Sequence, residues 1–182
     1  MSLGIQHKYI QASTADTVGG TVIGTTETSF VKRASIEANS LARGDFFLGF
    51  YTVLATATNA TDTLTTKVYV GPASAPETGI VVCDQTAIDV ANGQVIGGIF
   101  AFSIDALGTV SVLSLSAVGL SFTTALAAIS KTLAVSAATD AQVSSLVDLC
   151  VGVSAKWSAS SAGNSCYLSA LHTVKFPGLS SQ

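Results

Sequence analysis

The sequence predicts an all-β fold, an antiparallel β-sandwich of jelly-roll type with about eight strands and an extended N-terminal arm. Apolar residues alternate with polar ones through several segments, which is the period of a strand with one buried face. Turn-forming Gly, Pro, Asn and Asp separate these segments. Only 10% of the residues are charged while 48% are hydrophobic, so much of the surface must be uncharged. That composition favours an assembled protein over a free monomer.

The N-terminal arm is predicted over residues 1–27, where Thr, Ser, Gly and Ala dominate. Its apolar residues are too sparse to build a packed element of their own, so the arm is either a loose tail or docked on another surface. A docked arm could add a strand to a sheet edge of a neighbouring subunit. Residues 28–178 form the predicted sandwich domain, and residues 179–182 are a short tail. The candidate assembly residues of the arm are Tyr9, Ile10, Val22 and Ile23.

The strongest strand of the first half is expected at residues 46–57. Phe46, Leu48 and Phe50 share one face of it. Phe47, Tyr51 and Val53 share the other face. Because both faces are apolar, we expect both to be covered, which implies two layers.

Two further strands flank this one. A moderate strand is predicted at 28–37, followed by turn residues at 38–45. After a turn at 59–62, the alternation at 63–70 predicts a strand with Leu64, Val68 and Val70 on one face. We expect 46–57 and 63–70 to pair as a hairpin.

The middle of the chain continues the strand pattern. Gly71-Pro72 ends a strand, and short strands are expected at 78–83 and 86–90. Asn92-Gly93 predicts a turn into a long strand at 95–104, with 109–118 as the return strand. The inward face of the long strand is expected to carry Ile96, Phe100, Phe102 and Ile104.

One stretch, residues 106–130, has no charged residue and is long enough to cross a bilayer. Eight of its positions are Ser or Thr and two glycines interrupt it, which favours a strand over a membrane span. A short helix around 123–130 competes with strand, because Phe122, Leu126 and Ile129 recur at helical spacing.

The last third predicts two strands, at 146–157 and 165–176, joined by a small-residue turn at 158–164 and paired with each other. The first strand places Val151, Val153 and Trp157 on one face. In the second, strict alternation places Leu168, His172 and Val174 on one face and Leu171 on the other. Pro177-Gly178 ends the second strand.

Charge and cysteine usage exclude several classes of protein. The formal net charge is −3, and only eight Lys and Arg are scattered along the chain, so nucleic acid is not an expected partner. The three cysteines show no metal-ligand or redox spacing and are expected to be buried thiols. A bridge between Cys150 and Cys166 is the alternative. No signal sequence is recognisable at the start, which predicts synthesis in the host cytoplasm.

No catalytic or metal site is expected, and no cofactor. The two histidines, His7 and His172, have no nucleophile or orienting residue in a motif around them. His172 is expected to be a core or interface residue. Asp84, Asp89 and Asp105 lie near loops without the spacing of a calcium or glycosidase site. An enzyme such as a polysaccharide hydrolase is therefore the least supported class.

Two sequence blocks carry a resemblance. The first is IEANSLARGD at 36–45 with DTLTTKVYVG at 62–71, and the second is AKWSAS at 155–160 with Asn164. In this order they resemble a group of β-sandwich proteins of tailed-phage virions, several of which are capsid decoration (cement) or fibre modules. The resemblance spans roughly 28–176, and a long insert near 106–134 departs from the group. As scaffold, Gly44 can adopt positive φ and Asp45 can bond nearby backbone.

The resemblance implies a structural virion protein, most simply a decoration protein on the outer capsid surface. Its expected partners are the major capsid protein and further copies of itself, with a homotrimer implied by the resemblance; a membrane is not expected. The alternative is a tail-fibre or spike module that binds host-surface glycan through exposed aromatic rings. The candidate ligand-stacking or interface aromatics are Tyr51, Tyr69, Trp157 and Tyr167.

Overall fold

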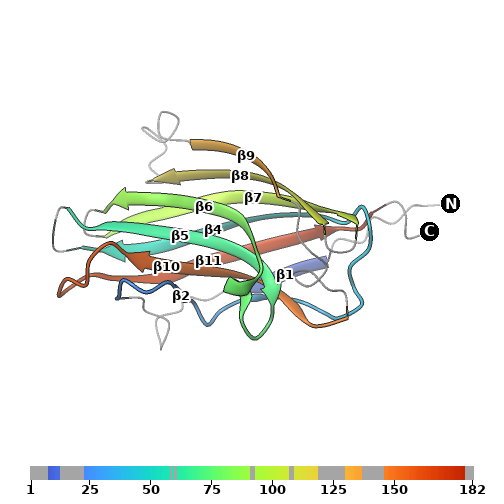
Figure 1. The fold of residues 1–182 in the computed structure, drawn as a ribbon, viewed down its shortest axis with the longest axis horizontal. Coiled ribbons are helices and arrows are strands. Elements are labelled where there is room, and N and C mark those ends of the chain that lie inside the picture. Colours follow the sequence, from blue (N-terminus) through green and yellow to red (C-terminus); the bar gives the residue numbers. More distant parts are fainter. Residues whose placement is uncertain are drawn as a thin grey trace.

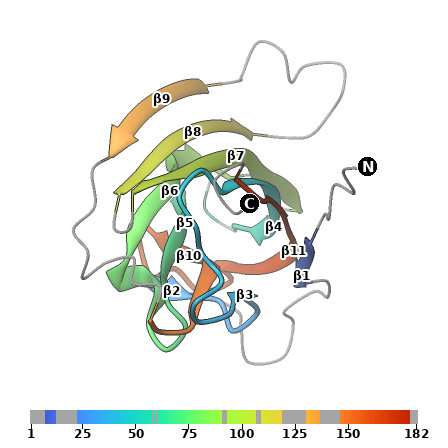
Figure 2. The ribbon, with the colours of Figure 1, turned by 90° about the vertical axis from the view of Figure 1, so that its right-hand side faces the viewer.

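The structure is a computed structural model that describes residues 8–12, 23–57, 59, 61–90, 93–106, 109–118, 130–136 and 146–178. The described residues form two antiparallel sheets packed face to face (Figures 1 and 2). The six-stranded sheet has the order β1 (Lys8–Ala12), β11 (Ser165–Phe176), β4 (Phe46–Thr56), β7 (Gln94–Ala106), β8 (Thr109–Val118), β9 (Ser130–Ser136). The five-stranded sheet has the order β2 (Thr28–Ser29), β10 (Leu149–Trp157), β5 (Thr63–Pro72), β6 (Ile80–Asp89), with β3 (Ala34–Ile36) also paired to β10.

The predicted fold class is confirmed. Eight strands, β4 to β11, have seven or more residues, and β1, β2 and β3 are short. Among the described residues the one helical element is a 3₁₀ turn, η1 (Pro76–Thr78). No helix in that part of the chain is long and apolar enough to cross a membrane. The helix considered at 123–130 lies outside the described residues except for Ser130, which begins β9.

Two predicted hairpins are wrong. β4 and β5 follow each other in the chain, yet β4 pairs with β11 and β7 while β5 pairs with β10 and β6. The same holds for β10 and β11, which lie in opposite sheets. Each of these strands carries apolar side chains that face the core, and two successive strands can both bury those side chains against one core by crossing from one sheet to the other. The pair predicted at 95–104 and 109–118 is confirmed as the β7–β8 hairpin.

Most predicted core faces are confirmed. Leu64, Val68 and Val70 of β5 are buried, and so are the inward residues of β7 and β10. Across the core, the Tyr51 hydroxyl is 2.8 Å from the hydroxyl of Thr66, which joins β4 to β5 between the sheets. The Phe47 and Phe102 rings stack with centroids 4.6 Å apart. Gly49 lies above the Phe100 ring, where a Cβ atom would clash with it.

The predicted face pattern of β11 changes at a β-bulge. The register with β4 shifts between Leu168 and Ala170, so one extra residue is inserted at that point. Because an inserted residue moves the following side chains to the other face, Leu168 and Leu171 are both buried. His172 and Val174 therefore lie on the outer face, so the core alternative for His172 is wrong and the interface alternative stays a prediction. The sequence carries no Gly or Pro at the bulge that would have indicated it.

Local turn predictions largely hold. Gly44, Gly93 and Gly163 adopt positive φ, as their turn positions require. β5 ends at Pro72 and β11 ends before Pro177. The short strands expected at 78–83 and 86–90 are one strand, β6, whose register with β5 shifts twice. The strand expected at 28–37 is divided into β2 and β3.

Two described pieces of the predicted arm belong to the sandwich. β1 pairs antiparallel with β11 along the edge of the six-stranded sheet, with Tyr9 opposite Val174 and Ile10 opposite Thr173. The Trp157 amide donates a hydrogen bond to the Gly24 carbonyl at 3.0 Å, which extends the pairing of the β2 segment with β10. The arm thus uses sheet edges of its own chain. A contact of the arm with another subunit stays a prediction.

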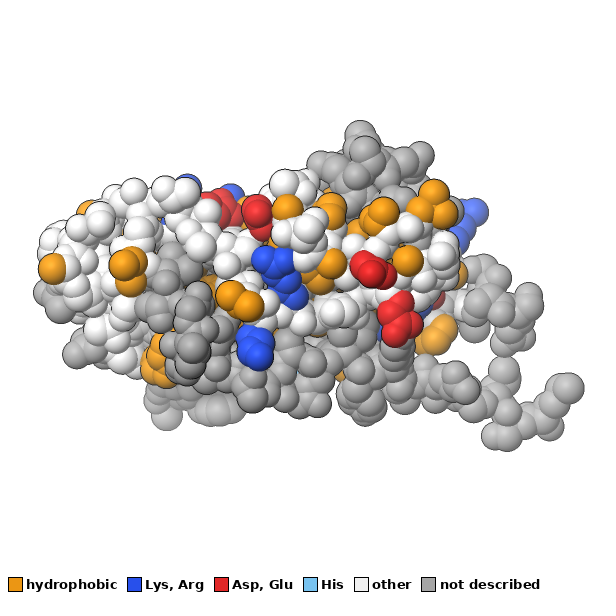
Figure 3. All heavy atoms as spheres, turned by 90° about the horizontal axis from the view of Figure 1, so that it is seen from below, with side chains coloured by type: hydrophobic (Ala, Val, Ile, Leu, Met, Phe, Trp, Pro, Cys, Tyr) orange, Lys and Arg blue, Asp and Glu red, His pale blue; other side chains and the backbone are white. Residues whose placement is uncertain are grey.

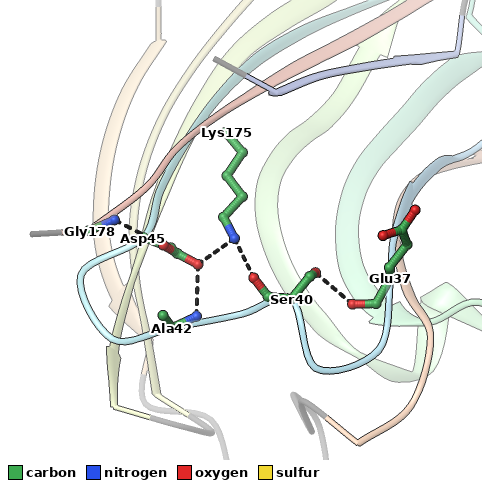
Figure 4. Close-up of polar contacts among 6 residues, drawn as sticks. All are labelled: Glu37, Ser40, Ala42, Asp45, Lys175 and Gly178. Carbon is green, nitrogen blue, oxygen red and sulfur yellow. Dashed lines mark hydrogen bonds and ion pairs between the residues drawn. The ribbon is translucent and has the colours of Figure 1, made fainter. Parts of the chain in front are cut away.

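Asp45 organises one end of the sandwich (Figure 4). Its carboxylate is 1% exposed and accepts hydrogen bonds from the backbone amides of Ala42 and Gly178, at 2.8 and 2.9 Å. It also forms an ion pair with Lys175, with Nζ 2.7 Å from Oδ2. Lys175 donates a further hydrogen bond to the Ser40 carbonyl. One carboxylate therefore holds the loop before β4 against the end of β11, the scaffold role that the sequence indicates for Gly44-Asp45.

We predict that Asp45→Ala lowers the free energy of unfolding by about 3–5 kcal/mol, because it leaves the Lys175 ammonium and two amides without their acceptor in a buried place. Urea unfolding followed by circular dichroism measures the change. The control is Asp89→Asn, since Asp89 is exposed at the end of β6, and it should shift the midpoint little. Equal midpoints for Asp45→Ala and the wild type would contradict the role given to this carboxylate.

Candidate assembly surface

The outer face of the six-stranded sheet carries the largest exposed apolar side chains of the strands that form the sandwich. On β4, Phe46, Leu48 and Phe50 are 39%, 41% and 45% exposed. Ile99 of β7 is 52% exposed. The expectation that both faces of residues 46–57 are covered is wrong for the single chain, because the fully buried side chains of β4, Phe47, Tyr51, Val53 and Ala55, all lie on one face. This outer face of β11, β4 and β7 is called the apolar face below.

Strand register brings these residues together. Leu48 lies between Val174 of β11 and Ala101 of β7, and Phe50 lies between His172 and Ile99. The Phe50 ring stacks on the His172 ring with centroids 4.7 Å apart. At the end of the strands, the Phe46 and Phe176 rings are 5.8 Å apart. The apolar face is therefore a continuous patch across three strands, placed by alternation on β4 and β7 and by the bulge on β11.

The side chains that the structure describes on the apolar face are all uncharged. Among the described residues, its positions on the three strands carry no Asp, Glu, Lys or Arg side chain: Phe46, Leu48, Phe50, Thr52 and Leu54; Gly97, Ile99, Ala101 and Ser103; Ala170, His172, Val174 and Phe176. A contiguous apolar patch without charge is uncommon on a free monomer and is typical of a surface that contacts another molecule.

The opposite outer surface has a different chemistry. Seen from below, where β2 and β10 lie, the molecule shows basic and acidic side chains between apolar ones (Figure 3). Glu27, just before β2, accepts hydrogen bonds from Ser154 of β10 at 2.7 Å and from the Tyr69 hydroxyl of β5. It also forms an ion pair with Lys67 at 3.1 Å. We call these four residues the Glu27 cluster; they hold the start of the sandwich domain across two strands.

The Glu27 cluster shifts the pKa values of its members. Partial burial works to raise the pKa of Glu27, but hydrogen bonds from Tyr69, Ser154 and Lys67 outweigh it and hold that pKa below its usual value. Burial together with the bond to Glu27 raises the pKa of Tyr69 to about 12. For Lys67, burial acts to lower the pKa, while the Glu27 carboxylate raises it and prevails.

The lowered pKa of Glu27 predicts an acid-dependent contribution to stability. Unfolded chains take up a proton near the ordinary glutamate pKa of about 4.3, while the native carboxylate stays charged to lower pH. The contribution is thus complete above that pH and is lost as the pH falls through the native pKa. Glu27→Gln should lose less stability than the wild type as the pH falls below about 4.3. Thermal unfolding measured at several pH values tests this prediction, with Asp84→Asn at an exposed position as the control. Parallel curves of stability against pH for Glu27→Gln and the wild type would contradict it.

The candidate residues that the sequence indicated lie partly in the core and partly at the surface. Tyr51 and Trp157 are 0% and 1% exposed, so their rings face the core and cannot stack on a ligand. Tyr69 is buried in the Glu27 cluster, and Tyr167 is half-buried on β11. Among the arm residues, Ile23 is 62% exposed and Val22 lies outside the described residues. Their role in assembly stays a prediction.

Sequence reasoning missed three residues of the apolar face. Ile99 was not singled out, although it is the one bulky residue on the outward face of β7 among Gly97, Ala101 and Ser103. His172 and Val174 were assigned to the wrong face of β11 because no residue type in the sequence indicates the bulge. Strict alternation along β7 contained the signal for Ile99, since Ile96 and Phe100 flank it on the inward face.

The three cysteines are buried and free, so the bridge considered between Cys150 and Cys166 does not form; they lie on strands of opposite sheets. Burial raises the pKa of the Cys150 thiol to about 11. Among the described residues no group of three or more His, Cys, Asp or Glu is placed to hold a metal ion.

We predict that the native thiols resist alkylation. At pH 8 the Cys150 thiol stays protonated, and all three sulfurs lie behind packed side chains, so iodoacetamide should add to none of them in an hour. Addition of guanidinium chloride should expose all three, which intact mass spectrometry counts. Rapid single addition to the native protein, mapped to Cys150, would show that this thiol is accessible.

The class of protein that this fold defines is an antiparallel β-sandwich of jelly-roll type. No protein-family model and no curated protein matches the sequence. Among solved structures, winged bean acidic lectin complexed with methyl-α-D-galactose matches with 10% identity and a TM-score of 0.49, over 96% of this chain and 93% of the lectin. A Lotus tetragonolobus seed lectin matches with 9% identity and a TM-score of 0.46, over 96% and 94%. A chain of infectious bursal disease virus, Gx strain, matches with 14% identity and a TM-score of 0.37, over 94% and 33%.

Proposed function

We propose that this chain is a structural protein of a virus particle, a capsid decoration protein that binds the major capsid protein of a tailed phage on the outer head surface. The observation that carries the proposal is the apolar face, an exposed sheet surface on which no charged side chain is described. A surface of this kind suits permanent burial in an assembly more than repeated binding and release of a soluble substrate. The sequence blocks at 36–45, 62–71 and 155–160 support the same class.

The stabilising action follows from binding linkage. A protein that binds the assembled lattice and not its dissociated subunits shifts the equilibrium toward the lattice, by an amount that grows with occupancy. A rigid module loses little conformational freedom on binding, so more of its contact energy remains as affinity. Asp45 and the Glu27 cluster supply that rigidity, because each fixes a loop or an incoming segment against strands of the sandwich.

The glycan-binding alternative receives less support from the site. It depends on exposed aromatic rings beside polar loops, and Tyr51 and Trp157 are in the core. The rings of Phe46 and Phe50 are exposed in the apolar face, and among the described side chains of that face none is a carboxylate or an amide that would bond sugar hydroxyls. We therefore prefer attachment to a protein lattice.

The proposal predicts that purified particles contain the chain in a fixed high ratio to the major capsid protein, measured by quantitative mass spectrometry. Immunogold labelling should place it over the whole outer head. Particles that lack the protein should release their genome at a lower temperature in a dye-release assay, and added purified protein should restore the wild-type temperature. A few copies per particle, labelled at the tail alone, would overturn the proposal.

A further inference from the structure

We propose that His172 makes attachment through the apolar face depend on pH, so that the chain binds its lattice when the imidazole is neutral and is released when the imidazole is protonated. The inference deepens the proposed function and rests on it, because it names the group that regulates the surface by which the chain attaches. Three features support it: the place of His172 on the sheet, the groups that surround it, and the charge that one proton adds.

His172 lies on the second strand of the six-stranded sheet, with a paired strand on each side. Its register partners are Phe50 of β4 and Gln11 of β1. The imidazole is half-buried and stacks on the Phe50 ring, with centroids 4.7 Å apart and an interplanar angle of 26°. Phe50 is among the exposed rings of the apolar face, so a molecule that covers this ring also covers the imidazole stacked on it. Attachment through the face therefore removes His172 from water.

His172 is the one titratable side chain among the described positions of the apolar face. The other positions on β4, β7 and β11 carry Phe, Leu, Ile, Val, Ala, Gly, Ser and Thr. Histidine is also the side chain whose charge ordinarily changes between about pH 5 and 8. A single proton on this imidazole thus turns an uncharged surface into one that carries a positive charge.

The charged residues of the neighbouring strands do not stand beside the imidazole. On β11, Lys175 lies over the inward Phe47 ring and binds Asp45. On β1, Lys8 is paired with Lys175 and not with His172. In the row of residues paired across the sheet from His172, the charged position is Lys131 of β9, four strands or about 19 Å away, where exposed charges are largely screened. Within the described strands, register places no carboxylate next to the imidazole.

Attachment favours the neutral imidazole, because a charge that leaves water for an apolar contact loses its hydration. The lattice groups that fit an uncharged face are themselves mainly apolar, since a charged group there would lose water without meeting an opposite charge. The attached chain therefore binds fewer protons at His172 than the free chain does. By linkage, affinity is greatest at high pH, where the free imidazole is already neutral, and it falls as the pH drops through the histidine range.

The test is the binding of the full chain to particles that lack it, measured by co-sedimentation at pH 7.5 and at pH 5.5. Exclusion of one proton weakens binding by up to about tenfold for each pH unit below the range in which the free imidazole titrates. We therefore expect the wild-type dissociation constant to rise about tenfold at pH 5.5. His172→Gln should remove most of that rise, whatever its own affinity at pH 7.5. The matched control is His7→Gln, at the other histidine of the chain, which should keep the rise.

Circular dichroism at both pH values must show that the variants are folded. The stabilising contribution of Glu27 is complete at pH 5.5, since it is lost only below about pH 4.3. If His172→Gln is unfolded, His172→Phe replaces it, because phenylalanine keeps a flat ring beside Phe50 and takes up no proton. Calorimetric titration at pH 6.5 in two buffers of different ionisation enthalpy counts the protons: the wild type should release more of them on binding than the His172 variant does.

The outcomes separate this inference from the proposed function. Wild-type binding that is equal at the two pH values or stronger at pH 5.5 would overturn the inference and leave the decoration role in place. A rise in the dissociation constant that persists in the His172 variant would do the same, because the titrating group would then lie elsewhere. A wild type that binds no particles at either pH would overturn both.

Discussion

The sandwich depends on a buried carboxylate at one of its ends. Asp45 precedes β4, and its partners Lys175 and Gly178 lie at and beyond the end of β11, so one side chain joins segments more than a hundred residues apart. β4 and β11 are neighbours in the six-stranded sheet, and their register carries the apolar face. The ammonium lies 5.9 Å from the centroid of the Phe47 ring, which extends the polar contact into the core. The geometry of the exposed face therefore depends on an interaction in the interior.

The two outer surfaces of the sandwich differ in their chemistry. On the five-stranded sheet, polar side chains bind one another within the chain. The Glu27 carboxylate accepts hydrogen bonds from Tyr69 and Ser154 and forms an ion pair with Lys67. The six-stranded sheet leaves its hydrophobic residues open and lacks charge among its described central positions. This asymmetry separates the contacts that hold one chain together from the surface offered to another molecule. Neither the Lys67–Glu27 nor the Lys175–Asp45 ion pair involves a side chain of the apolar face.

Sequence patterns predicted the fold class and most inward faces, because alternation along β4 and the first half of β5 directly reflects burial. They did not predict which strands pair, because the partners lie far apart in the sequence. Nothing local tells whether β4 returns onto β5 or crosses to the other sheet, since both arrangements bury the same residues. The bulge before Ala170 moved His172 outward without a Gly or Pro to indicate it. Asp45 was recognised as a local turn residue, but Lys175 as its partner required the three-dimensional structure.

The pairing of β4 with β11 also sets the order of events during synthesis. β11 is the last strand of the described chain, and β10, its predecessor, is the partner of β5. While the ribosome is still adding residues 130–160, β4 has no neighbour on the β11 side, and its hydrophobic residues remain exposed. Native contacts with such large sequence separation form slowly and leave nascent chains open to aggregation. The six-stranded sheet therefore cannot be completed until β11 has left the exit tunnel, so translation products that lack β11 leave one edge of β4 unpaired.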